Sequence, residues 1–296
     1  MSYAELKNAF IGFQHSFEEA EVVVIPVPYE GTVTYGTGTS KGPEAIIDSS
    51  NNLEVYDIEL GSNIFEKLSI HTLDELEVRE KTPEEMLDIV STNVKKILNA
   101  GKKPVVLGGE HSITSGALSA FEKPISVLQI DAHSDLRDSY DGTKNSHACA
   151  MRRAREITKD TVQVGIRSMC REEAEYIEKE GIQDSIFYAG DLQKNKKNNS
   201  LNKDDIEAIL SHLKNDVYLT VDVDGFDPSV IPGTGTPEPG GLLWYDVLSL
   251  IKSVSKEKNV VGFDIVEVAP IPNLSISEFT AAKLAYKMMG YFWAKS

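Results

Sequence analysis

A short stretch of the chain places three potential metal ligands at alternate positions. Asp131, His133 and Asp135 lie in the run Asp-Ala-His-Ser-Asp, directly after the apolar residues 125–130. That apolar run has the length and the β-branched content of a buried strand. Alternate residues of an extended chain point the same way, so the three side chains are expected to converge just past the strand. Buried carboxylates are costly unless they are paired or bound to a metal, so the stretch predicts part of a metal site.

Other acidic and imidazole side chains also come directly after apolar runs that are predicted to be strands. In open parallel sheets, ligands bind outside the carboxyl ends of the strands. Any one of these residues alone could be a helix N-cap or a surface acid, but all of them together indicate one shared site. They are His111 after 105–107, Asp222 and Asp224 after 217–221, and Glu267 after 260–265.

The charge of this set indicates which metals would suit it. Its four aspartates carry a charge of −4, which two divalent cations would neutralise. Carboxylate oxygens and imidazole nitrogens suit Mn²⁺ better than a zinc site selected by thiolates, although Zn²⁺ and Co²⁺ stay open. Two metals about 3.5–4 Å apart can lower the pKa of a bridging water and provide hydroxide at neutral pH. The expected chemistry is therefore metal-assisted hydrolysis. The candidate ligands are His111, Asp131, His133, Asp135, Asp222 and Asp224.

The elements that must position these residues alternate along the chain. Buried strands are predicted over 22–28, 105–107, 125–130, 162–166, 186–189, 217–221 and 260–265. Helices are predicted over 43–49, 82–101, 113–121, 151–157, 171–180, 204–213, from about 245, and over 275–291. Strands that alternate with helices predict an α/β fold with a parallel sheet covered on both faces. No internal repeat or linker interrupts the pattern, so residues 1–296 are expected to form one domain.

Local signals fix some element ends and leave other regions open. The spacing of a capping box occurs at two helix starts, Thr82 with Glu85 and Ser275 with Glu278. No element is placed over 51–80, residues 1–20 are expected to be irregular, and the polar stretch 193–203 is expected to be a solvated loop.

Composition and charge exclude several classes of protein. Hydrophobic residues make up 41% of the 296 residues, so a sizeable core is available. The formal net charge of −16 opposes binding to nucleic acid and is compatible with a cationic substrate, although acidity for solubility alone is the plainer interpretation. The two cysteines, Cys149 and Cys170, have no disulfide framework and fit a reducing compartment. With no evident signal peptide and no apolar stretch of about 20 residues, a cytoplasmic protein without a membrane span is expected.

Five blocks of the sequence resemble the signature blocks of the arginase/agmatinase (ureohydrolase) family, in the family's order. They are Gly-Gly-Glu-His-Ser (108–112), Asp-Ala-His-Ser-Asp (131–135), Asp-Val-Asp-Gly-Phe-Asp-Pro (222–228), Gly-Thr-Gly-Thr-Pro-Glu-Pro-Gly-Gly (233–241) and Asp-Ile-Val-Glu-Val-Ala-Pro (264–270). The resemblance spans residues from about 22 to 290. It implies the three-layer α/β/α arginase-like fold, two Mn²⁺ per subunit, and release of urea from a guanidino compound. It also implies a homo-oligomer, either a homotrimer or a homohexamer.

The resemblance assigns a role to individual residues. The first metal would be held by His111, Asp131, Asp135 and Asp222, and the second by Asp131, His133, Asp222 and Asp224. Asp131 and Asp222 would therefore bridge the two metals. His147 matches the family's flexible histidine, a proton shuttle, and Glu267 matches the carboxylate that holds the guanidinium. Thr234, in the Gly-Thr-Gly-Thr block, is expected to line the pocket.

The chemistry of a guanidinium agrees with these roles. Guanidinium is a poor electrophile, so a metal-bridging hydroxide held by Asp131 and its neighbours would supply a strong nucleophile. Glu267 would hydrogen-bond the cation and fix its carbon near that hydroxide. The departing amine needs a proton, and a histidine such as His147 titrates near neutrality. Cys149 is interpreted as a small buried residue and not as a nucleophile.

The loop after Asp135 is expected to choose the substrate. Its sequence, Leu-Arg-Asp-Ser-Tyr-Asp-Gly (136–142), departs from the arginase pattern. Asp138 and Asp141 could favour a distal amine, whereas Arg137 could favour a carboxylate or pair with a neighbouring aspartate. The run 232–241 looks more like agmatinases. The prediction is therefore a decarboxylated substrate, agmatine or aminopropylagmatine, with arginase or guanidinobutyrase activity as the alternative.

Two other classes stay open. One is a deacetylase-like amidohydrolase in which a single zinc ion hydrolyses an amide. The other is a non-catalytic homologue that serves as a binding or structural protein. The paired Asp-x-His-x-Asp and Asp-x-Asp sets favour two metals, and every expected ligand is present.

Overall fold

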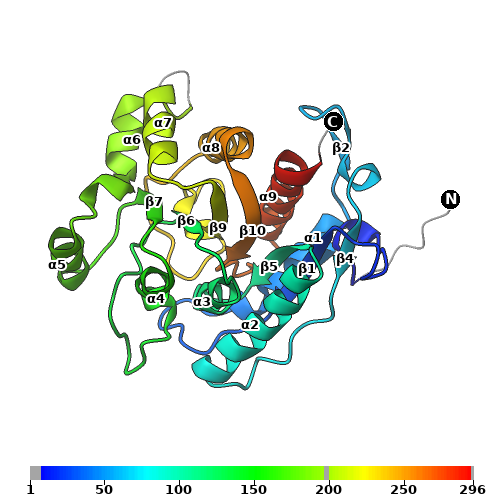
Figure 1. The fold of residues 1–296 in the computed structure, drawn as a ribbon, viewed down its shortest axis with the longest axis horizontal. Helices are drawn as coiled ribbons and strands as arrows, with labels where there is room; N and C mark the ends of the chain where they lie inside the picture. The colour runs from blue at the N-terminus through cyan, green and yellow to red at the C-terminus, as the bar shows by residue number, and fades with distance from the viewer. Residues whose placement is uncertain (1–7, 197–199, 295–296) are drawn as a thin grey trace.

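A computed structural model describes residues 8–196 and 200–294 and has one large parallel sheet at its centre (Figure 1). The strand order is β4-β1-β5-β10-β9-β6-β7-β8, and every neighbouring pair is parallel. The eight strands are β1 (Val22–Val27), β4 (Ile70–Thr72), β5 (Lys103–Gly108), β6 (Ser126–Ile130), β7 (Thr161–Ile166), β8 (Ile186–Tyr188), β9 (Asp216–Asp222) and β10 (Asn259–Val266). A separate antiparallel pair is formed by β2 (Tyr56–Asp57) and β3 (Ser62–Asn63).

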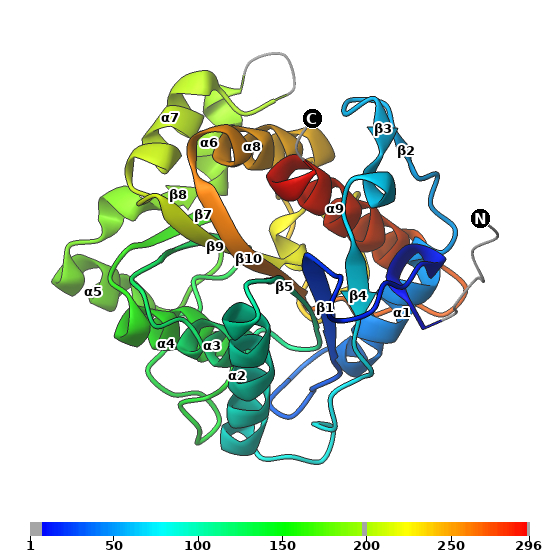
Figure 2. The same cartoon turned by 45° about the vertical axis from the view of Figure 1, so that its right-hand side comes forward.

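Helices cover both faces of this sheet. Figure 2 shows α2, α3 and α4 on one face and α7, α8 and α9 on the other. The helices are α1 (Gly42–Ser50), α2 (Pro83–Asn99), α3 (Ile113–Ser119), α4 (Ala150–Ile157), α5 (Arg171–Glu180), α6 (Ala189–Asn195), α7 (Lys203–Ser211), α8 (Trp244–Glu257) and α9 (Ile276–Trp293). The predicted α/β class with a three-layer arrangement is confirmed, and the sheet is wholly parallel within the described chain.

The two layers of helices pack on two separate cores because strand side chains alternate between faces. In β1, Val22 and Val24 face the core that includes Ile46 of α1, whereas Val23 and Ile25 face the core that includes Val90 of α2. Strands buried on both faces read as continuous apolar runs, which is why the sequence predicted them from β-branched content alone. Burial on both faces fixes the register and therefore the position of each strand end.

Helix α2 begins as the sequence predicted, but α9 does not. Thr82 has extended backbone, and its side chain and that of Glu85 satisfy each other's backbone N–H groups in a capping box. Ser275 has near-helical backbone, with φ −86° and ψ 14°, and its side chain caps nothing. A side chain reaches the first-turn N–H groups from an extended N-cap, so the predicted capping box of Ser275 and Glu278 is wrong.

The structure adds elements in three regions where the sequence placed none. The 51–80 region contains the edge strand β4 and the β2–β3 pair, and a 3₁₀ turn at Phe10–Gly12 lies in the segment expected to be irregular. The predicted solvated loop 193–203 begins inside α6, which Ala189 and Leu192 anchor by burial at a spacing of three residues. Residues 197–199 of that predicted loop, and 1–7 of the N-terminal segment, lie outside the described residues.

Because the strands are parallel, the carboxyl ends of β1, β5, β10, β9, β6 and β7 meet at one edge of the sheet. The segment that follows each of these strands contributes to the site described next. Two loops approach each other so closely at this edge that only glycine fits. A Cβ on Gly225 would lie 2.7 Å from the backbone nitrogen of Asp131.

Candidate metal centre

His111 is surrounded by carboxylates at the bottom of the site. Its Nδ1 lies 3.0 Å from Asp135 Oδ2, 3.1 Å from Asp131 Oδ2 and 3.4 Å from Asp222 Oδ2. This nitrogen is buried and makes no hydrogen bond to any of them. The other ring nitrogen, Nε2, lies 2.9 Å from Thr220 Oγ1. A histidine whose Nε2–H is held by a hydroxyl presents the lone pair of Nδ1, which is how a metal-binding imidazole is oriented.

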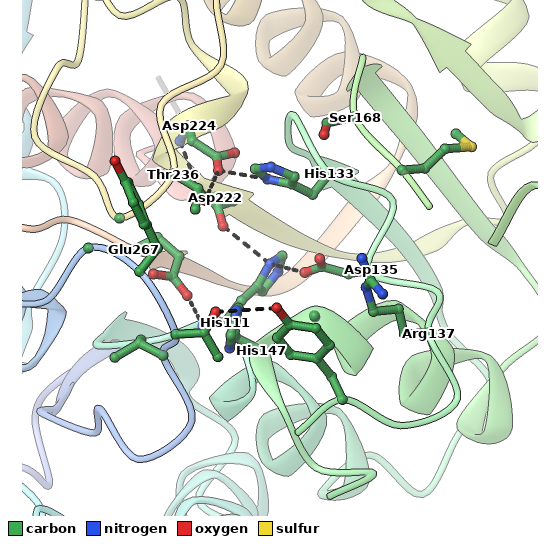
Figure 3. A pocket seen from close by; sticks show the side chains of 18 of the residues that line it. His111, His133, Asp135, Arg137, His147, Ser168, Asp222, Asp224, Thr236 and Glu267 are labelled. Carbon is green, nitrogen blue, oxygen red and sulfur yellow. Dashed lines mark hydrogen bonds and ion pairs between the residues drawn. The ribbon is translucent and has the colours of Figure 1, made fainter. Parts of the chain in front are cut away.

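A second cluster is centred on His133. Its Nδ1 lies 2.9 Å from Asp224 Oδ2 and 3.7 Å from Asp131 Oδ1. In Figure 3, the labelled histidines and aspartates of the two clusters point toward one another from the ends of β5, β6 and β9. Two groups have ligand atoms within 4.8 Å of one another, namely His111 with Asp131 and Asp135, and Asp131 with His133 and Asp224.

The two clusters share one residue, Asp131. Its Oδ2 faces His111 of the first cluster, and its Oδ1 faces His133 of the second. Asp222 belongs to neither of the two groups, but its Oδ2 faces His111 and its Oδ1 accepts a hydrogen bond from the Asp224 backbone. The donor set is made of carboxylate oxygens and imidazole nitrogens without a thiolate, which fits hard or borderline divalent cations.

The carboxylates of this site perturb one another strongly. Burial raises the pKa of Asp131 well above its usual range, and the charges of Asp224 and Asp135 raise it further. Burial and the same kind of repulsion raise the pKa of Asp222. Burial alone would lower the pKa of His133, but its hydrogen bond to Asp224 and the surrounding charges raise it to about 11. The site therefore favours positive charge, which protons supply when metal ions do not.

Glu267 stands beside the clusters in a backbone conformation that few residues adopt. Its φ is 65°, in the left-handed region, and Asp135 has a φ of 52°. Non-glycine residues in this region cost free energy and tend to occur at functional sites. The backbone N–H of His111 donates to Glu267 Oε1 at 2.7 Å, and the backbone N–H of Glu267 donates to Gly109 at 2.8 Å. The carboxylate is thus aimed by two fixed backbone contacts.

The clusters lie at the base of a cavity of about 280 Å³, which suits a small molecule. Its base includes His111, His133, Asp135, Asp222, Asp224 and Glu267. Its walls include Val33–Gly36, Arg137, Tyr140, His147, Ser168–Cys170, Gly235 and Thr236. The sequence blocks at 108–112, 131–135, 222–228, 233–241 and 264–270 therefore all reach this one cavity.

His147 lines the cavity at the start of a 3₁₀ turn, His147–Cys149. Its ring packs edge-on against Tyr140, with ring centroids 5.9 Å apart. Its Nδ1 lies 3.2 Å from Thr32 Oγ1 and 3.3 Å from Ser146 Oγ. Cys149, two residues on, is fully buried, and burial raises its thiol pKa to about 11. Such a thiol stays protonated, in keeping with its interpretation as a packing residue.

The predicted substrate-binding residues are placed differently from one another. Arg137 lines the cavity and stacks over the Tyr140 ring at 4.8 Å, without pairing with a neighbouring aspartate. Asp138 is outside the cavity lining and forms an ion pair with Arg153 at 2.9 Å.

Thr234 also lies outside the cavity lining and is replaced there by Thr236. The hydroxyl of Thr234 is buried without a hydrogen-bond partner, whereas Thr236 lines the cavity with its hydroxyl 3.4 Å from Asp224 Oδ2. The structure thus places Thr236, two residues further along the loop, at the cavity wall that Thr234 was expected to line. It likewise gives Asp138 a structural ion pair in place of the expected pocket position.

Several residues that support the site were not predicted from the sequence. Each acts through hydrogen bonds to a predicted site residue or to its loop. Arg167, directly after β7, donates to six backbone carbonyls, including that of Asp224 at 2.6 Å. Glu173 accepts from Ser134 Oγ at 2.6 Å and from the backbone of Leu136, so it holds the loop around Asp135. The residues missed are Thr32, Glu110, Arg167, Glu173 and Thr220. Arg167 follows a predicted strand and could have been found by the strand-end argument.

Within residues 8–196 and 200–294, no helix combines the length and apolar character that a membrane span requires.

Comparison with known proteins agrees with this geometry. A sequence model described as Arginase family matches residues 20–290. An N(1)-aminopropylagmatine ureohydrolase from Synechocystis is 42% identical over 289 residues, which cover 95% of this chain and 92% of that protein. An agmatinase from Pyrococcus horikoshii is 34% identical over 275 residues, 92% of each chain. The crystal structure of an agmatine ureohydrolase of Thermoplasma volcanium matches with a TM-score of 0.83 at 34% identity, over 99% of this chain and 94% of that one. The chain belongs to the arginase family.

Proposed function

We propose that the chain is a ureohydrolase that cleaves a cationic guanidine, agmatine or aminopropylagmatine, to urea and an amine. The observation that carries the proposal is the pair of ligand clusters sharing Asp131 at the base of a cavity of small-molecule size. The names of the relatives support the reaction and the class of substrate.

The donor atoms fit two divalent cations, which we propose to be Mn²⁺. His111 and Asp135 would hold one ion, and His133 and Asp224 the other, with Asp131 and Asp222 between them. The orphaned, buried Nδ1 of His111 supports this placement, because three carboxylates face it without a hydrogen bond. Two such cations would lower the pKa of a shared water, so that a strong nucleophile is available at neutral pH.

Glu267 would bind and orient the guanidinium. Burial raises the pKa of this carboxyl, and the charges of Asp222 and Glu110 raise it further, so it gains from a cationic partner. Its Oε1 is engaged by the His111 backbone, and its Oε2 lies toward Gly235 on the cavity wall. A carboxylate held in this way accepts N–H groups of a planar guanidinium and fixes the position of its central carbon.

His147 would move the proton that the reaction requires. The water oxygen adds to the guanidinium carbon, the bond from that carbon to the alkyl-bearing nitrogen breaks, and this nitrogen leaves as an amine after taking a proton. His147 lines the same cavity as Glu267, and an imidazole nitrogen can both accept and donate a proton.

A second candidate function is favoured by Arg137. Its guanidinium lines the cavity, stacks on Tyr140 and forms no ion pair with a described carboxylate. An unpaired cation at this position suits a substrate with a distal carboxylate, such as arginine or guanidinobutyrate.

Urea release from a panel of guanidines tests the proposal. The Mn²⁺-loaded protein should release urea with the highest kcat/KM from agmatine or aminopropylagmatine. A higher kcat/KM with arginine or guanidinobutyrate would overturn the decarboxylated substrate and favour the second candidate. Absence of urea from all four compounds would overturn the reaction itself.

We further propose that the enzyme is a single-domain, cytoplasmic homo-oligomer. The family match runs through residues 20–290 without a break, which supports a single domain over 1–296. Cys149 and Cys170 are free thiols, which supports a cytoplasmic location. We propose a homotrimer or homohexamer, as the family resemblance implies, and light scattering of the purified protein would measure its mass.

A further inference from the structure

A buried carboxylate is linked to the ring of His147 through one threonine hydroxyl. Thr32 Oγ1 lies 2.5 Å from Glu110 Oε1 and 3.2 Å from His147 Nδ1. The backbone N–H of Thr32 also donates to Glu110 Oε2 at 2.7 Å, and the backbone N–H of His147 donates to Thr32 Oγ1 at 3.0 Å. Glu110 is fully buried. The hydroxyl is therefore fixed from both sides, by the loop after β5 and by the turn that begins at His147.

Three donors converge on the Glu110 carboxylate. They are the hydroxyl and the backbone N–H of Thr32 and the hydroxyl of Ser112, whose Oγ lies 2.6 Å from Oε1. Both oxygens of Glu110 therefore act as acceptors. A hydroxyl has one hydrogen and two lone pairs, so the single hydrogen of Thr32 is used toward Glu110.

The two lone pairs of the Thr32 hydroxyl determine which ring nitrogen of His147 carries the hydrogen. One lone pair of Thr32 Oγ1 accepts the backbone N–H of His147, and the other faces Nδ1 of the same residue. Two lone pairs cannot form a hydrogen bond, so Nδ1 must carry the hydrogen. The neutral ring then has its lone pair at Nε2, the nitrogen that can take up and release a proton in the cavity.

Ser146 offers the competing arrangement. Its Oγ lies 3.3 Å from Nδ1, and its hydroxyl could donate to a bare Nδ1 or accept from a protonated one. The Thr32 hydroxyl lies slightly closer and has no hydrogen left to donate, so it favours the protonated Nδ1. The tautomer would be reversed only if the Ser146 hydroxyl donated to a bare Nδ1.

We infer that Thr32, backed by Glu110, is a positioning residue that holds His147 as the Nδ1–H tautomer. In this arrangement a base is oriented by a hydroxyl, which is in turn oriented by a carboxylate. Thr32 also accepts from Nδ1 when the ring becomes imidazolium, so the same contact serves both protonation states of the ring. The catalytic consequence rests on the proposed role of His147, whereas the tautomer itself does not.

Kinetics of three variants test the catalytic consequence. Thr32→Val removes the hydroxyl at nearly constant shape and should lower kcat by about 10- to 100-fold, which is part of the roughly 10²- to 10⁴-fold that general acid–base catalysis contributes. KM should stay within about threefold, because the substrate contacts remain. Thr32→Ser keeps the hydroxyl and should recover most of kcat. Thr37→Val, an exposed threonine of the same loop, is the matched control and should match the unmodified protein.

The metal content of each variant is measured at the same time, because Glu110 adjoins His111. A Thr32→Val protein that keeps its metal and its melting temperature but loses kcat supports the inference. Unchanged kcat in Thr32→Val, or failure of Thr32→Ser to recover kcat in a folded and metal-loaded protein, would overturn the catalytic consequence.

Nitrogen NMR of the full chain tests the tautomer without any reaction. The protein is labelled with ¹⁵N-histidine and kept free of paramagnetic metal, and His147→Asn identifies the resonances of the ring. We expect a protonated Nδ1 and a bare Nε2, with the opposite tautomer dominant in Thr32→Val. A bare Nδ1 in the unmodified protein, or a tautomer that changes in Ser146→Ala but not in Thr32→Val, would overturn the inference. If no guanidine yields urea, the proposed function fails while this measurement still decides the tautomer.

Discussion

The guanidinium of Arg167 donates a hydrogen bond of 2.6 Å to the backbone carbonyl of Asp224. The same side chain donates to the carbonyls of Phe226 and Glu238 at 3.2 and 2.8 Å. One residue at the end of β7 thus ties the loop that follows β9 to the glycine- and proline-rich segment around 238. The Glu238 carboxylate lies 3.8 Å from His133 Nε2, so these contacts of Arg167 involve the loops around two proposed metal ligands of the second cluster, Asp224 and His133.

Replacing Arg167 should therefore loosen the second cluster. Arg167→Lys keeps the charge but loses the planar fork of donors, so several buried carbonyls lose their partners. We expect the free energy of unfolding to fall by about 2–4 kcal/mol and the metal affinity by about tenfold. Denaturant unfolding and metal titration measure the two effects. Arg171→Lys, whose side chain is 92% exposed, is the control and should change stability by less than about 0.5 kcal/mol. Equal effects of the two substitutions would show that Arg167 does not hold these loops in place.

Thr220 should control the metal affinity of the first cluster. Its hydroxyl lies 2.9 Å from Nε2 of His111 and 3.3 Å from Thr114 Oγ1, which donates to the buried Asp264 at 3.0 Å. Thr220→Val removes the acceptor that fixes the ring, and such changes cost about 10- to 100-fold in metal affinity. Thr220→Ser should keep the affinity within about threefold of the unmodified protein, because it keeps the hydroxyl. Calorimetric metal titration compares the two, and equal affinities would show that Thr220 does not orient His111.

Metal binding should release protons and strengthen as the pH rises. Without metal, the pKa of His133 is raised to about 11, and the pKa values of Asp131 and Asp222 are also raised. At neutral pH the ring of His133 therefore keeps a proton that a metal ion must displace. The apparent affinity should rise by about tenfold per pH unit for each proton displaced, and fall correspondingly toward acid pH. Titrations in buffers of different ionisation enthalpy measure the released protons. An affinity that is the same at pH 6 and pH 8 would contradict this electrostatic description.

The sequence predicted the base of the site better than its walls. Asp131 and Glu267 directly follow apolar, β-branched runs, and a parallel sheet buried on both faces brings such strand ends to one edge. Thr32 and Tyr140 lie in loops without periodicity, so only the tertiary structure brings them to His147. Thr236 lines the cavity where Thr234 was expected, because a shift of two residues within one glycine-rich loop changes which hydroxyl faces the cavity.

The fold shows the same limit. Long apolar strands such as β1 and β10 were predicted from composition, whereas β4 has only three residues at the sheet edge and carries no distinct pattern. Helix α6 was missed because its apolar residues, Ala189 and Leu192, stand among polar ones that resemble a loop. The two capping boxes had the same residue spacing, but the backbone at Ser275 is set by the turn before it, which spacing does not reveal.

Arg137 should discriminate between substrates by the charge of their distal group. Its guanidinium faces the cavity over Tyr140 and would repel a distal ammonium but attract a carboxylate. Arg137→Ala should therefore raise kcat/KM for agmatine by about three- to tenfold and lower it for guanidinobutyrate by a similar factor, as expected for a partly exposed charge. Parallel assays of the two compounds measure the ratio. A ratio that does not change would place the distal group of the substrate elsewhere in the cavity.

The most direct test of the account is urea release from the metal-stripped protein as Mn²⁺ is added back in measured equivalents. With agmatine or aminopropylagmatine as substrate, we expect no urea without metal and a rate that levels off at two equivalents per chain, because the two clusters share Asp131. Asp131→Asn, which removes the shared carboxylate, should fail to recover the rate at any equivalent. Full activity at one equivalent, or urea release by the metal-free protein, would contradict a two-metal ureohydrolase.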